Sequence, residues 1–139
     1  MEKNGIINWR NALLGGLIGT LFFDVIGYTA TGIWWDIPSV LGEKTGLGMV
    51  YGVLGHYGNG LLLAVLYAGI APSLWGPAWF RTFTFVTVET IALVWFFMFP
   101  LLGAGIGGIG LGHIIPLVSL IRHFAYGVPL FYFVHKFSK

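Results

Sequence analysis

The chain has 139 residues, of which 57% are hydrophobic and only 9% are charged. Soluble domains carry about a quarter charged residues, so five acids and seven bases cannot cover a water-soluble surface of this size. The chain has no cysteine, which excludes disulfides, thiolate metal sites and iron–sulfur clusters.

Four apolar stretches follow one another along the chain. Each is long enough for a bilayer core, which takes roughly 20 helical residues. Breaks near Pro38, Pro72 and Pro100 separate them. The sequence therefore predicts an all-α, four-helix transmembrane bundle that forms one domain over 1–139. The predicted spans are about 11–33, 47–70, 78–100 and 114–136.

The basic residues are unevenly divided between the two ends of the predicted bundle. The end that holds both termini carries Lys3, Arg10, Arg81, Lys136 and Lys139. The other end carries only Lys44, beside two acids. Basic loops stay in the cytoplasm, so we expect a multi-pass protein of the cell inner membrane with both termini cytoplasmic.

The two halves of the sequence resemble each other. The first span of each half contains one acid, Asp24 or Glu89, and the second contains one histidine, His56 or His123. The acid and the histidine are almost equally far apart in the two halves. This pattern predicts a tandem two-helix repeat.

The four polar residues fall at one depth, near the middle of the predicted spans. Ionisable residues at mid-membrane are costly and mark functional sites. Neutral imidazole is an axial ligand of haem iron, so His56 and His123 on diagonal helices predict a haem b site. A porphyrin also needs small neighbours, and one turn from the histidines the chain has Gly52, Gly60, Ser119 and Gly127.

Other interpretations of the same residues stay open. His56, His123, Asp24 and Glu89 together would suit iron, copper or zinc. Arg122 also lies near mid-membrane and needs a partner, for which Glu89, or else Asp24, is the natural candidate. Acid–histidine chains also relay protons in membranes, and glycines four apart simply let helices pack closely.

A glycine-rich segment at 103–110 matches the G-x-G-x-x-G pattern. That pattern indicates nucleotide binding only between a strand and a helix, and here it follows a membrane span. We therefore expect no nucleotide and no nucleic acid, but a loop that packs at the membrane surface.

With so little chain outside the lipid, we expect an electron-transfer or accessory subunit rather than an enzyme. Its partners would be membrane lipid and other membrane subunits, as in a respiratory or oxidase complex, with or without a cofactor.

Several short motifs occur in a characteristic order over about residues 11–134. They are Asp36-Ile37-Pro38-Ser39-Val40-Leu41-Gly42, His56 with Gly60, Pro100-Leu101-Leu102-Gly103-Ala104-Gly105, and His123 with Tyr126-Gly127. In this the chain resembles a family of small four-helix bacterial membrane proteins of unknown function. The resemblance implies the four-span fold and marks Asp36, His56 and His123. Asp24 and Glu89 are not part of the family pattern.

Overall fold

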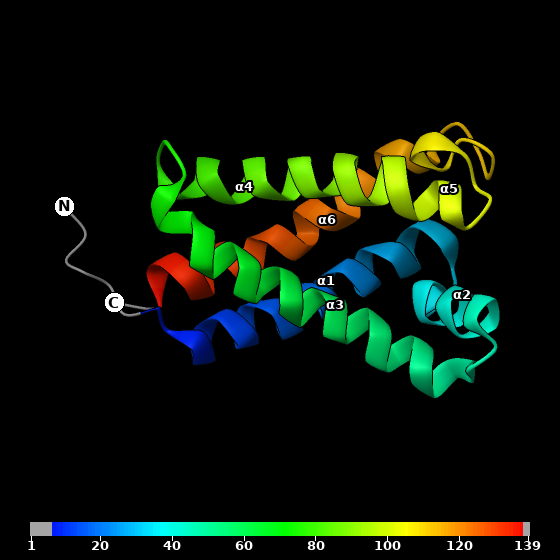
Figure 1. Ribbon diagram of the computed structural model, residues 1–139, viewed down its shortest axis with the longest axis horizontal. Coiled ribbons are helices and arrows are strands. Elements are labelled where there is room, and N and C mark those ends of the chain that lie inside the picture. Colours follow the sequence, from blue (N-terminus) through cyan, green and yellow to red (C-terminus); the bar gives the residue numbers. More distant parts are fainter. Residues whose placement is uncertain (1–6, 138–139) are drawn as a thin grey trace.

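The computed structural model describes residues 7–137, which form an all-α bundle (Figure 1). Four helical segments in this range are long and apolar enough to cross a membrane. They are Trp9–Thr31, Gly48–Ser73, Ala78–Leu101 and Ile115–Lys136. The predicted four-helix fold is confirmed, and the chain is a multi-pass membrane protein.

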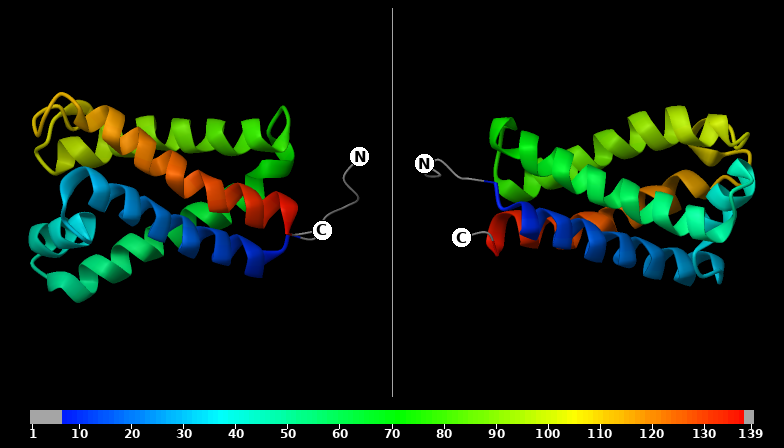
Figure 2. Two further views of the ribbon diagram at one scale, coloured as in Figure 1. Left: turned by 180° about the vertical axis from the view of Figure 1, so that it is seen from behind. Right: turned by 60° about the horizontal axis from the view of Figure 1, so that its bottom comes forward.

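The first and last described residues lie at one end of the bundle (Figure 2). The Asn11 side-chain amide donates to the Phe137 carbonyl at 2.9 Å, which ties the two ends of the chain together. Helix α1 (Trp9–Thr31) begins at Asn8, whose side chain caps the first turn, and ends at Gly32 in the left-handed conformation.

Helix α1 lies at the centre of the packing. It packs along both α3 (Gly48–Ile70) and α6 (Ile115–Phe131). The third span starts as α4 (Ala78–Glu89) and packs mainly against α6. No extensive contact joins it to α3 in the described range, so the bundle is splayed on that side (Figure 1).

A short helix, α2 (Asp36–Thr45), forms where the sequence predicted only a connection. It starts after Trp35, the one non-glycine residue with positive φ (57°) in the described range, and ends at Gly46. Helix α2 folds back on α3, and the approach is so close that a Cβ on Gly52 would overlap the Pro38 carbonyl oxygen. Glycine is needed there for packing, not for backbone flexibility.

The third span is not a uniform α-helix. After Glu89 it widens into a π-helix, η2 (Thr90–Met98), and closes with the single turn α5 (Phe99–Leu101). The buried Thr90 hydroxyl donates to the Val86 carbonyl at 2.7 Å, at the point where the hydrogen-bond pattern changes. Wide helical turns of this kind occur frequently at functional sites.

The glycine-rich segment folds into a compact turn around η3 (Ile106–Gly108). Gly107 and Gly108 are buried and have positive φ, so the backbone turns inward there. The side chains of Ile106, Ile109 and Leu111 point outward and are more than half exposed. This surface is as apolar as the helices that face the lipid.

Candidate functional site

The first acid–histidine pair forms a buried cluster between α1 and α3. Asp24 is 1% exposed, and its Oδ1 lies 2.9 Å from Nε2 of His56. The Tyr57 hydroxyl donates to the other oxygen, Oδ2, at 2.8 Å. Both side-chain oxygens of Asp24 therefore make a hydrogen bond, and the His56 ring is oriented through its Nε2 atom.

The second acid–histidine pair is looser. Nδ1 of His123 lies 2.6 Å from the Ser119 carbonyl oxygen one turn earlier in α6. Its Nε2 atom faces Oε1 of Glu89 at 3.9 Å, which is too long for a hydrogen bond. Each half thus brings its acid near its own histidine, but with different geometry.

The two histidines share one neighbour, Phe23. The Phe23 ring centroid is 5.4 Å from that of His56 and 4.9 Å from that of His123. The Arg122 guanidinium carbon lies 4.2 Å from the same ring centroid, a cation–π contact. A porphyrin between the two imidazoles would require this ring to move.

A cavity of about 270 Å³ lies at this level of the bundle. All four spans and α2 contribute to its lining. Its polar part includes His56, His123, Arg122 and Asp36. Its walls are mainly apolar, with Leu63, Val94, Met98, Phe99, Ile115 and Val118.

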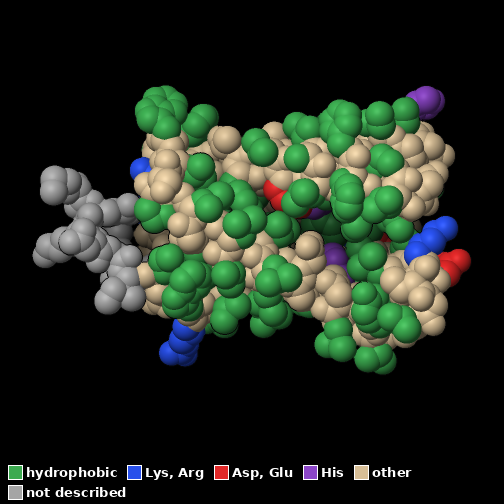
Figure 3. Space-filling view, in the orientation of Figure 1, with side chains coloured by type: hydrophobic (Ala, Val, Ile, Leu, Met, Phe, Trp, Pro, Cys, Tyr) green, Lys and Arg blue, Asp and Glu red, His purple; other side chains and the backbone are tan. Residues whose placement is uncertain are grey.

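The cavity coincides with the splayed side of the bundle. Figure 3 shows a hollow between the third span and the α2–α3 pair, with acidic and histidine side chains visible inside it. The surrounding surface is apolar. In a bilayer this opening would face the lipid, since it lies between two helices that span the membrane.

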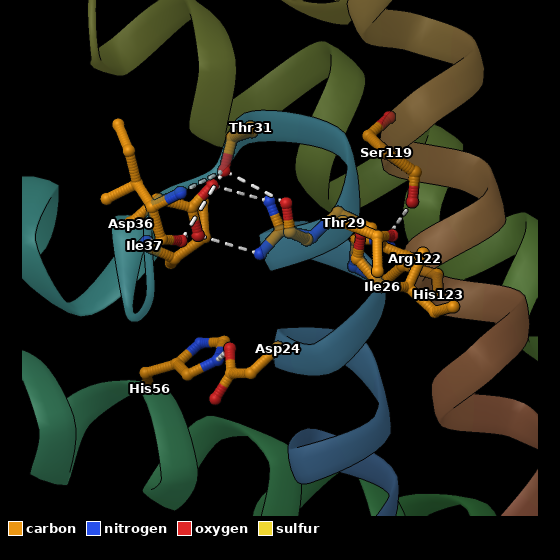
Figure 4. A network of polar contacts seen from close by, with 12 residues as sticks. Asp24, Ile26, Thr29, Thr31, Asp36, Ile37, His56, Ser119, Arg122 and His123 are labelled. Atoms are coloured by element: carbon orange, nitrogen blue, oxygen red, sulfur yellow. Dashed lines mark hydrogen bonds and ion pairs between the residues drawn. The ribbon is translucent and has the colours of Figure 1, made fainter.

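The partner of Arg122 is Asp36, not Glu89 or Asp24 (Figure 4). Nη1 donates to Oδ2 at 2.7 Å and Nη2 donates to Oδ1 at 2.8 Å. The predicted Arg122–Glu89 ion pair is therefore wrong. The expectation compared only the depths of the backbone positions, whereas a long arginine side chain extends toward the membrane surface and meets Asp36 at the start of α2.

The four small residues near the histidines have different surroundings. Gly60 and Ser119 line the cavity. Gly52 packs on α2, while Gly127 is enclosed by Phe83 and Val86 of α4. Gly60 also packs closely, because a Cβ there would overlap the Thr20 hydroxyl. Close helix packing therefore explains the three glycines, whereas the Ser119 hydroxyl accepts a hydrogen bond from Trp95.

The four residues predicted as a metal set do not form one cluster. Among residues 7–137 no group of three or more histidine, aspartate or glutamate side chains is arranged to hold a metal ion. Asp24 and His56 lie together on one side of Phe23, and Glu89 approaches only His123. The iron, copper or zinc site stays a prediction without a matching ligand cluster.

Two members of the site, Tyr57 and Phe23, were not predicted. Tyr57 follows His56 directly, and a tyrosine beside a buried acid–histidine pair is a natural third donor. Phe23 precedes Asp24, but nothing in the sequence distinguishes it from the other phenylalanines, of which the chain has 12 in all.

Comparison with known protein families, characterised proteins and solved structures finds no match for this chain. The family resemblance noted in the sequence therefore stays a prediction.

Proposed function

We propose that this protein is a membrane-embedded binding or accessory subunit whose cavity takes a lipid-soluble molecule from the bilayer. One observation carries the proposal: a largely apolar cavity, open between two membrane spans, contains two histidines. Apolar pockets with a few convergent polar groups are the usual form of small-molecule sites. The histidines would bind the polar head of the molecule, and the gap beside α3 would admit its apolar chain.

Native mass spectrometry of the purified protein tests this proposal. We expect the wild type to retain a small lipophilic molecule and Val118→Phe, which fills the cavity, to lose it. Leu117→Phe is the matched control, because Leu117 is 55% exposed and is absent from the cavity lining. Equal retention by both variants would place the molecule elsewhere and contradict the proposal.

Haem b between His56 and His123 is the second candidate. One observation favours it: one ring nitrogen of each histidine has an orienting partner. Asp24 orients His56, and the Ser119 carbonyl oxygen orients His123. Ligating histidines usually have such partners. If bound, haem would supply one-electron redox chemistry, and these two contacts would fix the ring orientations. The Phe23 ring is the obstacle, since it contacts both imidazoles.

An absorbance spectrum of the purified protein tests the haem candidate. Two imidazole ligands should give a low-spin spectrum, which either His56→Ala or His123→Ala should abolish or alter. His113→Ala is the control, because His113 is exposed in the loop before α6. A colourless protein that gains no such spectrum when haem is added contradicts this candidate.

We also propose that the end of the bundle holding residues 7 and 137 faces the cytoplasm of the inner membrane. Arg10 and Lys136 support this orientation, because both are exposed at that end. Lys44, in α2, lies at the other. Cysteine labelling from outside the cell should modify Lys44→Cys and not Lys136→Cys, and the reverse pattern contradicts the orientation. Association with other membrane subunits stays a prediction.

A further inference from the structure

The hydrogen-bonding character of the His123 nitrogen that faces the cavity follows from its other ring nitrogen. The Ser119 carbonyl oxygen can only accept, so Nδ1 of His123 carries the proton. Nε2 of the uncharged ring then has a lone pair and no hydrogen. Its one polar neighbour, Oε1 of Glu89, is 3.9 Å away, and no described residue donates a hydrogen bond to it. His123, which lines the cavity, therefore has a free hydrogen-bond acceptor.

His56 also lines the cavity, and Asp24 orients it, because Oδ1 of Asp24 lies 2.9 Å from its Nε2 atom. Nδ1 of His56 has no hydrogen-bond partner among the described residues. It is therefore a second ring nitrogen that is available to a ligand.

We propose that the ligand is a lipid-soluble molecule whose polar head carries a hydroxyl group. The hydroxyl would donate to Nε2 of His123, and Nδ1 of His56 would be the second polar contact of the head group. A protonated fatty acid and an alkyl hydroquinone share this chemistry, whereas an ester or an ether lacks the donor. This inference rests on the proposed function and adds the class of head group.

Four probes test the inference on the full-length wild-type protein in lipid nanodiscs. They form two pairs, palmitic acid with methyl palmitate and decylhydroquinone with its dimethyl ether. Methylation removes the donor and leaves the apolar chain in place. We expect the hydroxyl member of at least one pair to bind at least about tenfold more tightly than its methylated partner, because methylation leaves the buried acceptor unpaired. The pair whose two members bind with different affinities shows whether the head group is that of a fatty acid or that of a hydroquinone.

A matched pair of variants ties the discrimination to His123. His123→Phe should bind the hydroxyl and methylated probes equally, and its binding of the methylated probe shows that the variant is folded. His113→Phe, outside the cavity, should discriminate as the wild type does. Equal binding within both pairs by the wild type would overturn the head-group inference and leave the cavity proposal standing. Binding of none of the four probes would overturn both, and discrimination that survives in His123→Phe would overturn the role of His123.

Discussion

Arg122 holds Asp36 through two parallel hydrogen bonds of 2.7 and 2.8 Å. The two residues are 86 positions apart in the sequence, and the contact joins α2 to α6 across one end of the cavity. Paired arginine–carboxylate bonds are the strongest common side-chain contacts. The ion pair therefore fixes the position of α2, which forms part of the cavity lining.

We expect Asp36→Leu to destabilise the protein strongly, because it leaves the buried Arg122 charge without a partner. Loss of one member of a buried pair costs about 3–5 kcal/mol. Changing both residues to leucine should recover most of that loss. Unfolding of the purified protein in mixed micelles measures the stability of the wild type and of the two variants. A double variant no more stable than Asp36→Leu contradicts the pairing.

Glu89 provides the control for the same experiment. Glu89→Gln keeps the size of the side chain and replaces its carboxyl group with an amide. Because no hydrogen bond or ion pair joins Glu89 to Arg122 among the described residues, the effects of Glu89→Gln and Asp36→Leu should add within about 0.5 kcal/mol. Strong coupling between them would favour the ion pair that the sequence suggested.

Close helix packing at Gly60 gives a second prediction. A Cβ there would overlap the Thr20 hydroxyl on α1, so Gly60→Ala should lower the free energy of unfolding by about 1–3 kcal/mol. Gly58 lies on the same helix with open space around its Cβ position. Gly58→Ala should therefore be neutral or stabilising by up to about 1 kcal/mol. Equal effects of the two changes in the same unfolding assay would contradict the packing.

Hydropathy predicted the four spans because each is a long apolar stretch with few charges. The same property hid α2, since this short helix is polar enough to look like a loop. Asp36 was therefore expected only in a connection, and the partner of Arg122 was expected among the acids of equal depth, Glu89 and Asp24. Depth alone predicted that Asp24 and His56 lie at one level, but the hydrogen bond between them and the contacts of Phe23 depend on tertiary packing.

The cluster around Asp24 gives a third prediction. Tyr57→Phe removes one hydrogen bond to the Asp24 side chain, and such a bond contributes about 0.5–1.5 kcal/mol. Asp24→Leu should cost more, because it leaves both Nε2 of His56 and the Tyr57 hydroxyl without their partner. Thermal unfolding in detergent measures the loss of stability in each variant and shows which loss is larger. Tyr57→Phe proving more damaging than Asp24→Leu would show that Asp24 does not organise the cluster.

Phe23 gives the last prediction, with its neighbour Phe22 as the matched control. Phe23 is 9% exposed and contacts both imidazoles and the Arg122 guanidinium. Phe23→Ala should therefore cost about 3–5 kcal/mol of stability. Phe22 is 45% exposed on the outer surface of α1, where lipid replaces its contacts, so Phe22→Ala should cost much less. The absorbance spectrum of Phe23→Ala with added haem is a second measurement, because removal of the ring opens the space between His56 and His123. A low-spin spectrum in this variant and none in the wild type would identify Phe23 as the group that keeps a porphyrin out of the native protein.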